Sequence, residues 1–392
     1  MKNPKLFIGA KRLAQLPPYL FAELDRKKRQ AVRSGRDVID LGVGDPDMAT
    51  PSLIIQRLRL EAARKETHRY PSYNGLQEFR EVIADWFESR FSVPLDPNRE
   101  VLVLIGSKEG LGHLPWALLD PGETAIIPNP AYPVYENGTL LAGGKPFRIP
   151  LLEEDRYLPD LEAIAPNMAD AAKLLYLNYP NNPTGAVADA DFFQSVVDWA
   201  VRYNVVICHD AAYTEIAFNG YRPPSLLSVA GAKKVGVEFH SLSKTFNMTG
   251  WRVGFAVGNA DVIKALGEIK KNVDSGVFGA VQYAGIEALD HYSELIDDIR
   301  MVYQDRRDVL VEGLTRLGWK LHKTEATFYV WARPPVERSS TQLAERLLEE
   351  TAIAVAPGVG FGTLGEGYIR FSLTNEKSRI EEAVDRIKKV GF

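Results

Sequence analysis

The sequence predicts an α/β fold, in which a mostly parallel sheet is flanked by helices, together with a smaller α+β domain. Two observations carry this prediction. Between about residues 75 and 260, short apolar runs alternate with helical patterns, and the runs show little internal alternation, as strands buried on both faces should. After about residue 275, a long helical region precedes a few short strands.

The first expected elements are an arm, a helix and a short strand. Pro17 and Pro18 can start a helix over residues 19–32, where apolar side chains recur. Residues 38–46 then predict a short strand that breaks into a turn.

Six apolar runs predict the strands of the main sheet, and residues 189–203 predict a helix between two of them. The runs are residues 101–105, 124–127, 173–177, 204–208, 235–239 and 253–257.

The C-terminal part is predicted to be helical over about residues 279–317, extended near 328–331, and helical again over 340–350 and 377–390. These patterns divide the chain into three parts. They are residues 1–34, an arm and helix that belong to the small domain; residues 35–275, the large domain; and residues 276–392, the small C-terminal domain.

The composition is that of a globular protein with a sizeable core. Hydrophobic residues make up 45% and charged residues 25% of the 392 positions, and the formal net charge is −4. A balance this near zero gives no electrostatic reason to expect nucleic acid or an anionic membrane as partner. The single cysteine, Cys208, excludes an internal disulfide framework, and the six histidines show no metal-ligand spacing. The N-terminal apolar stretch is too short for a signal peptide, so a cytoplasmic location is expected.

Polar residues follow several of the predicted strands, at the sheet edge where ligands of open α/β folds bind. Ser107 and Lys108 open a helix after residues 101–105, where free N–H groups could receive an anion. A rigid turn over residues 178–185 follows the run 173–177. His209, Asp210 and Tyr213 come after the run 204–208. Lys244 follows residues 235–239, and Arg252 lies eight residues further on.

Each of these residues alone has an ordinary structural interpretation. Ser107 or Asp210 could cap a helix, and Lys244 could be one surface lysine among many. The residues at positions 181–185, Asn-Asn-Pro-Thr-Gly, could form only a turn. Their joint placement at one edge favours pyridoxal 5′-phosphate, which needs a lysine for its aldehyde, a carboxylate for its ring nitrogen and cationic donors for its phosphate.

The sequence resembles the fold-type I, aspartate aminotransferase-like enzymes that use pyridoxal 5′-phosphate. The resemblance is carried by Asn-Asn-Pro-Thr-Gly, by Asp210-x-x-Tyr213, and by Ser-Leu-Ser-Lys at 241–244 followed by Arg-Val-Gly at 252–254. It covers nearly the whole chain, and it implies amino-group transfer between an amino acid and a 2-oxo acid.

The resemblance implies a role for each residue around the cofactor ring. Lys244 binds the aldehyde covalently and later moves the substrate proton, while Asp210 pairs with the pyridine nitrogen. Asn182 and Tyr213 hydrogen-bond the ring oxygen, and Tyr132 stacks on the ring face, although Tyr132 could also be an ordinary packing residue.

The resemblance also implies a phosphate site shared between two subunits. Ser107, Lys108, Ser241 and Arg252 surround the phosphate. Tyr70 reaches the phosphate of the neighbouring subunit, which implies a homodimer; as an alternative, Tyr70 could pack within its own subunit.

Substrate recognition is expected to centre on Arg370, whose planar fork suits the α-carboxylate, although it could instead form a surface ion pair. Gly44, Tyr19 and Asn182 are the further candidates for substrate binding. The helix near Tyr19 and the small domain are expected to close over the substrate and exclude water.

Several segments are similar to the branch of the family that acts on LL-diaminopimelate with 2-oxoglutarate, in lysine biosynthesis. These include residues 16–21, 41–47 and 238–251. A substrate with a distal ammonium and carboxylate should meet opposing charges, yet the loop over residues 70–75 carries Tyr73 and Asn74 and no acid. Residues 270–275 could supply such charges, or could form a solvated connection.

Three other functions stay open at this point. One is a general glutamate-linked aminotransferase for alanine, aspartate or aromatic amino acids. Another is a lyase on the same scaffold that eliminates a β-substituent. The third is a cofactor-sensing transcription regulator, which would need a DNA-binding domain; only about 35 residues precede the main body, too few for a winged helix.

Overall fold

The computed structural model describes residues 9–17 and 20–391. Its largest sheet has seven strands in the order β2-β8-β7-β6-β5-β3-β4. Strands β3 to β7 run parallel to one another, whereas β8 runs antiparallel to both of its neighbours, β7 and β2. The strands are β2 (Val101–Leu104), β3 (Thr124–Asn129), β4 (Lys145–Pro150), β5 (Ala172–Asn178), β6 (Val206–Asp210), β7 (Gly236–Ser241) and β8 (Gly254–Gly258).

All six predicted strands of the main sheet are confirmed, and the prediction missed one, β4. Five of the six residues of β4 are partly or fully exposed, and the strand carries two prolines and two cations. Such a composition is tolerated at a sheet edge but lacks the apolar signal of a buried strand. The predicted α/β class is confirmed.

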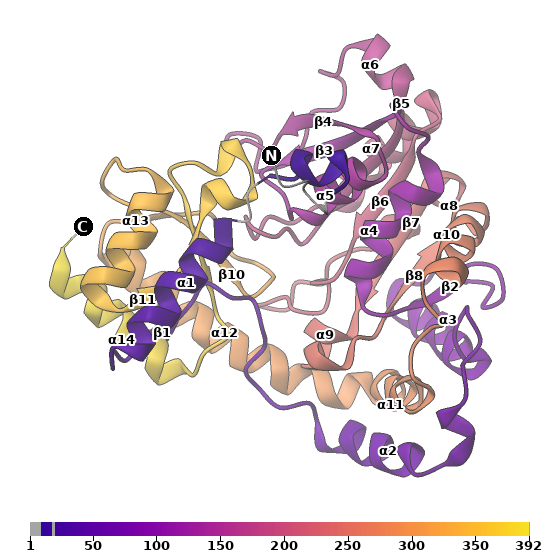
Figure 1. Ribbon diagram of the computed structural model, residues 1–392, viewed down its shortest axis with the longest axis horizontal. Coiled ribbons are helices and arrows are strands. Elements are labelled where there is room, and N and C mark those ends of the chain that lie inside the picture. Colours follow the sequence, from indigo (N-terminus) through magenta and orange to yellow (C-terminus); the bar gives the residue numbers. More distant parts are fainter. Residues whose placement is uncertain (1–8, 18–19, 392) are drawn as a thin grey trace, which may run out of the picture.

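Helices cover both faces of the large sheet (Figure 1). Side chains alternate between the two faces along each strand: Leu102 and Leu104 of β2 join the core on one face, and Val101 and Val103 join the core on the other. The first face carries α4 (Ser107–Leu118), α5 (Val134–Leu141) and α10 (Ala260–Val273), and the second carries α3 (Gln77–Phe91), α7 (Ala190–Tyr203) and α8 (Ala232–Val235).

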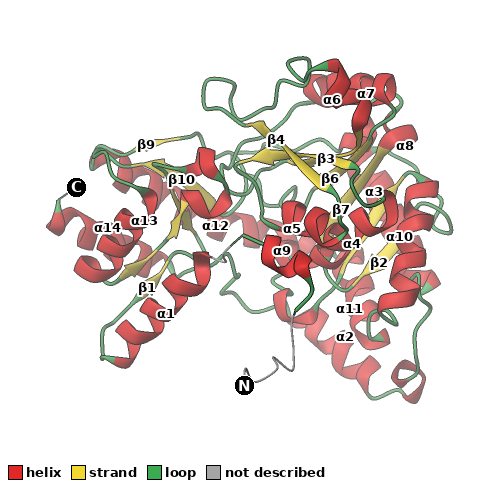
Figure 2. Cartoon of the chain, turned by 45° about the horizontal axis from the view of Figure 1, so that its top comes forward, coloured by secondary structure: helices red, strands yellow, loops and turns green. Residues whose placement is uncertain are grey.

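The smaller part of the molecule is built on a second sheet, ordered β12-β13-β10-β9. Figure 2 shows this sheet beside the C-terminal helices, and the apolar side chains of the two elements share one core. The elements are α1 (Leu20–Arg33), α12 (Tyr292–Arg316), β9 (Lys320–Leu321), β10 (Tyr329–Arg333), α13 (Ser340–Arg346), β11 (Ile353–Ala354), β12 (Ala356–Pro357), β13 (Ile369–Ser372) and α14 (Lys377–Val390).

Three expectations about these elements need correction. The strand expected in residues 38–46 is only β1 (Ile39–Asp40), which pairs with β11 rather than with the large sheet. The helix expected over 279–317 is divided at His291 into α11 (Gly279–Asp290) and α12. The helix expected over 340–350 ends in a π-helical turn, Leu347–Thr351.

We keep the division into residues 1–34, 35–275 and 276–392 as a proposal. The packing of α11 against α3 and α2 (Ser52–Ala62) places α11 among the helices of the large sheet. This packing favours a boundary between the large and small domains near His291 rather than at 275/276. From there α12 extends toward the small sheet (Figure 1).

Candidate active site

A cavity of about 730 Å³ lies at the carboxyl ends of β5, β6 and β7, and residues of the small sheet close it from the other side. This is the edge at which open α/β sheets bind ligands. Eleven of the residues predicted from the sequence line it: Gly44, Ser107, Lys108, Tyr132, Asn182, Asp210, Tyr213, Ser241, Lys244, Arg252 and Arg370.

The two other predicted residues are Tyr70 and Tyr19. Tyr70 is 89% exposed on the surface of this chain and does not line the cavity. Tyr19 lies outside the described residues.

Asp210 ends strand β6 and is buried at the floor of the cavity. Its Oδ2 accepts a hydrogen bond of 2.8 Å from the hydroxyl of Tyr135, and its Oδ1 has no partner among the described residues. Burial raises the pKa of Asp210, and the hydrogen bond from Tyr135 opposes that rise. One buried carboxylate oxygen is therefore held ready for a donor that comes from the cavity.

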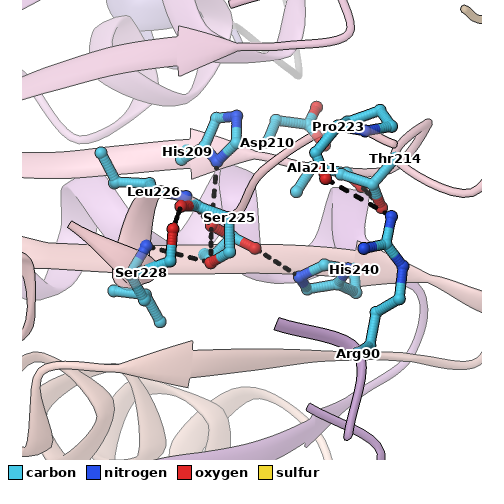
Figure 3. Close-up of polar contacts among 12 residues, drawn as sticks. Arg90, His209, Asp210, Ala211, Thr214, Pro223, Ser225, Leu226, Ser228 and His240 are labelled. Atoms are coloured by element: carbon cyan, nitrogen blue, oxygen red, sulfur yellow. Dashed lines mark hydrogen bonds and ion pairs between the residues drawn. The ribbon is translucent and has the colours of Figure 1, made fainter. Parts of the chain in front are cut away.

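A buried polar network lies behind Asp210 (Figure 3). The carboxylate of Glu238 contacts Nδ1 of His209 at 3.1 Å and Nε2 of His240 at 2.7 Å, and it accepts bonds of 2.9 Å from Ser225 Oγ and Leu226 N. These contacts hold the pKa of Glu238 below its usual range, although burial acts in the opposite direction. The network fixes β6 and β7 under the site.

Lys244 lies in the short helix α9 (Leu242–Thr245), which follows β7 directly. Its Nζ donates a hydrogen bond of 3.0 Å to the carbonyl oxygen of Gly44. Burial lowers the pKa of Lys244, and the nearby cations Arg252 and Arg370 act in the same direction. The amine is thereby shifted toward its neutral, nucleophilic form.

Arg370 approaches from β13 of the small sheet and is 6% exposed. It donates 2.8 Å to Asn182 Oδ1 and 2.7 Å to the carbonyl oxygen of Gly42, while its Nε has no partner among the described residues. The guanidinium lies 4.0 Å from the ring centroid of Tyr329. A fixed cation with free donors at a cavity wall suits a carboxylate.

The opposite end of the cavity is cationic and begins at a helix N-terminus. Ser107 and Lys108 start α4, whose first N–H groups face outward from the helix end. Arg252 is held at a positive φ of 55° and donates 2.8 Å to Thr249 O. At Gly106, which has a φ of 74°, an added Cβ would overlap the Arg252 guanidinium, so the backbone passes closely under that cation.

The sequence analysis missed two tyrosines. Tyr329 lines the cavity, and its hydroxyl lies 3.3 Å from that of Tyr213. Its position in an apolar run, 328–331, gave only a strand signal. Tyr135 contacts Asp210 from the first turn of α5. Its place three positions after Tyr132 was the only available signal.

Residues 270–275, which could supply distal charges or form a solvated connection, do not line the cavity of this chain. Lys270 is buried, and its Nζ binds Asp274 at 2.8 Å and Glu109 at 3.3 Å; it does not line the cavity. Charges of both signs instead lie near α1 and β1, where Lys28 binds Asp40 at 2.7 Å and Asp25 at 3.2 Å. All three of these residues line the cavity.

These observations fit pyridoxal 5′-phosphate. Asp210 Oδ1 is a buried acceptor without a protein partner, as a protonated ring nitrogen requires. Lys244 supplies an amine with a lowered pKa, and Lys108 with Arg252 supplies cations at a helix start. Within the described residues, no cluster of His, Cys, Asp and Glu could hold a metal ion, and no helix is long and apolar enough to cross a membrane.

Comparison with known proteins gives concordant results. Residues 36–387 match the family model for class I and II aminotransferases. An LL-diaminopimelate aminotransferase of Syntrophobacter fumaroxidans is 53% identical over 386 residues, which cover 98% of this chain and 100% of that one.

Solved structures agree closely with the fold. The substrate-bound structure of BacF from Bacillus subtilis superposes with a TM-score of 0.95 at 38% identity, covering 99% of both chains. An aspartate aminotransferase variant from Thermus thermophilus has a TM-score of 0.91 at 30% identity, covering 98% of this chain and 100% of that one.

Proposed function

This chain belongs to the class I and II aminotransferases, and from that premise we propose that it moves an amino group between LL-diaminopimelate and 2-oxoglutarate. The observation that carries the substrate is 53% identity, over nearly the full length of both chains, to an enzyme with that name. Enzymes of this family use pyridoxal 5′-phosphate, in agreement with the cofactor predicted from the sequence.

The cavity residues divide into groups that hold the cofactor. When bound, pyridoxal 5′-phosphate supplies an electron-withdrawing ring that makes the α-proton of an amino acid removable. We assign Asp210 to the ring nitrogen, and Asn182 with Tyr213 to the ring oxygen. Tyr132 covers the ring face. The phosphate is assigned to Ser107, Lys108, Ser241 and Arg252, all of which line the cavity.

Lys244 is the residue that moves the proton. Its buried amine has a lowered pKa, so that once released from the cofactor its Nζ can accept the α-proton of the substrate. Protonated Lys244 would then carry the proton away from the α-carbon, because the 2-oxo acid product leaves without it. The carbonyl of Gly44, 3.0 Å from Nζ, fixes the direction of the amine.

Arg370 orients the substrate by its α-carboxylate. Its contacts with Asn182 Oδ1 and Gly42 O hold the guanidinium in one orientation, and its partner-free Nε adds a donor. A carboxylate fixed in this way places the α-carbon over Lys244 and restricts rotation of the substrate. We assign Gly44 to the same substrate wall.

A substrate charged at both ends is supported by further charged residues of the cavity lining. Asp25, Lys28 and Asp40 bring two carboxylates and one ammonium to its lining. The distal end of LL-diaminopimelate carries one ammonium and one carboxylate, so the two sets of charges are complementary.

We propose a cytoplasmic homodimer. The location is supported by the single buried Cys208, which gives no internal disulfide. The dimer is supported by Tyr70, which is 89% exposed, and by the neighbouring side chains of Tyr73 and Phe278, which are 48% and 45% exposed. Gly276, close to Phe278 in sequence, lies against Pro71, so these apolar groups form one surface.

A substrate panel tests the proposed activity. Amino transfer from LL-diaminopimelate to 2-oxoglutarate should be faster than transfer from alanine, aspartate or aromatic amino acids, and β-substituted amino acids should release no pyruvate. Fast transfer from alanine or aspartate without detectable diaminopimelate turnover would identify the general aminotransferase instead. Lys244→Ala should retain cofactor but lose steady-state turnover, and near-normal turnover would refute the role of Lys244.

A mixing experiment tests the shared site. Lys244→Ala and Tyr70→Ala subunits should each have little activity as homodimers. When they are unfolded and refolded together, a mixed dimer contains one site with both native residues, so activity should be recovered. Refolding each variant alone is the control, and absence of recovery from a confirmed mixed dimer would contradict the assignment of Tyr70.

A further inference from the structure

We propose that Tyr135 is a positioning residue for the cofactor, which orients the Asp210 carboxylate so that Oδ1 would be free to accept from the ring nitrogen. This inference rests on the assignment of Asp210 in the proposed function. It concerns a residue that does not itself contact the cofactor, because its hydroxyl is occupied by Asp210 Oδ2 at 2.8 Å.

The two carboxylate oxygens of Asp210 are not equivalent, and Tyr135 is the cause. Oδ2 accepts the phenol, whereas Oδ1 is buried without a partner among the described residues. A phenol that bonds one oxygen stops rotation of the carboxylate about its last torsion angle, which is otherwise a broad, two-fold rotor. Because Asp210 lines the cavity, the remaining oxygen is the one left to accept a donor from a bound ring.

The position of Tyr135 is itself fixed by packing. Its side chain is fully buried, and its ring is stacked on that of Tyr176 with centroids 4.8 Å apart and an interplanar angle of 17°. The ring of Tyr132 meets it edge-on at 5.9 Å. Tyr135 thus connects the residue assigned to the ring face with the residue assigned to the ring nitrogen.

The direction of the hydrogen bond follows from the charges. Burial and the adjacent Asp210 raise the pKa of Tyr135 well above its usual value, so the phenol keeps its proton and donates it. This donor stabilises the ionised form of Asp210 against the desolvation that favours the neutral form. If Asp210 is ionised, the shared proton would stay on the ring nitrogen. If Asp210 is neutral, the carboxyl group itself would hold that proton.

Cofactor binding to the apoenzyme separates this role from general stability. We would measure dissociation constants for pyridoxal 5′-phosphate and for its 1-deaza analogue, which has carbon in place of the ring nitrogen. The wild type should prefer the nitrogen-containing cofactor. Tyr135→Phe should reduce that preference roughly tenfold, the size of one hydrogen bond to a charged group, and should shift the absorbance of the bound cofactor.

Tyr176→Phe is the matched control. It removes a fully buried phenol hydroxyl from the same aromatic stack, but that hydroxyl donates 3.0 Å to Leu111 O and does not contact Asp210. The cofactor preference of Tyr176→Phe should equal that of the wild type. If Tyr135→Phe fails to fold, Tyr135→Met fills a similar volume without the hydroxyl and carries the same comparison.

The outcomes distinguish the two levels of the proposal. A preference that is unchanged in Tyr135→Phe, or reduced equally in Tyr176→Phe, would overturn the role of Tyr135. Asp210→Asn should abolish the preference altogether; if it does not, the assignment of Asp210 is wrong and the inference fails with it. Because no amino acid is present, none of these results depends on the identity of the substrate.

Discussion

Arg370→Lys tests how this site recognises an amino acid. Arg370 uses two of its five N–H donors on Asn182 Oδ1 and Gly42 O, and its Nε is free of partners among the described residues. Lysine keeps the positive charge, but it cannot offer two parallel donors to one carboxylate. The substitution should therefore weaken substrate binding while the cofactor contacts stay in place.

The size of the effect follows from the number of bonds. Of two charge-assisted hydrogen bonds to the substrate carboxylate, lysine can replace about one, so the loss is about 1.5–3 kcal/mol. This corresponds to a roughly 10- to 150-fold decrease in kcat/KM for amino acids. Lysine also leaves the Asn182 amide oxygen and the Gly42 carbonyl incompletely bonded, which acts in the same direction.

The assay is the half-reaction, in which the absorbance of the bound cofactor changes when the holoenzyme is mixed with one amino acid. The same measurement with ethylamine, which lacks the carboxylate of alanine, isolates the role of Arg370. The variant should lose most of its preference for alanine over ethylamine. Arg307→Lys is the control, since Arg307 is also buried but lies outside the cavity lining. An unchanged preference in Arg370→Lys would refute the reasoning.

Three further predictions concern stability and the cavity wall. Glu238→Gln should lower the free energy of unfolding by about 3–5 kcal/mol, because an amide cannot accept all the bonds that reach the buried carboxylate. The control is Glu162→Gln at an exposed ion pair, which should lower the free energy of unfolding by less than about 1 kcal/mol. Urea unfolding at one protein concentration would compare the two variants. In the apoenzyme, the pKa of Lys244 is below its usual 10.5, so the unfolded chain binds more protons than the folded chain. The free energy of unfolding should therefore rise as the pH increases toward 10.5. Lys244→Met should remove that rise, which urea unfolding at several pH values would measure. Gly44→Ala would place a Cβ against the Tyr329 hydroxyl, so KM for amino acids should increase with little change in global unfolding; an unchanged KM would contradict the close approach.

The strands of the large sheet were predictable because burial on both faces demands continuous apolar runs. The same logic failed for β4, an edge strand with the sequence Lys-Pro-Phe-Arg-Ile-Pro. The short strand in residues 38–46 was predicted, but its partner was not, because the two residues of β1 pair with β11, more than 300 positions away in the sequence. Pairing over such a distance depends on the tertiary structure and leaves no local signal.

The candidate site was predictable where a chemical motif and a strand end coincide. Asp210, Ser241 and Lys244 each follow an apolar run, and parallel strands bring their ends to one edge. Tyr329 had no such signal, because it enters the cavity from the second sheet. The sequence left residues 270–275 open between a source of distal charge and a solvated connection, because only the fold shows that the Lys270 ammonium is buried against Asp274 and Glu109.

Burial lowers the pKa of Lys244 and raises the pKa of Asp210, and the neighbours of the two groups differ in how they act on these shifts. Low solvent access favours the neutral form of both Lys244 and Asp210. In the proposed mechanism this is the required form for Lys244, because a proton acceptor must have a free electron pair, and the nearby Arg252 and Arg370 reinforce it. For Asp210 it is the wrong form, and Tyr135 opposes it with a buried hydrogen bond. Two groups that line one cavity are thereby shifted toward different charge states, as the proposed proton transfer beside a protonated ring would require.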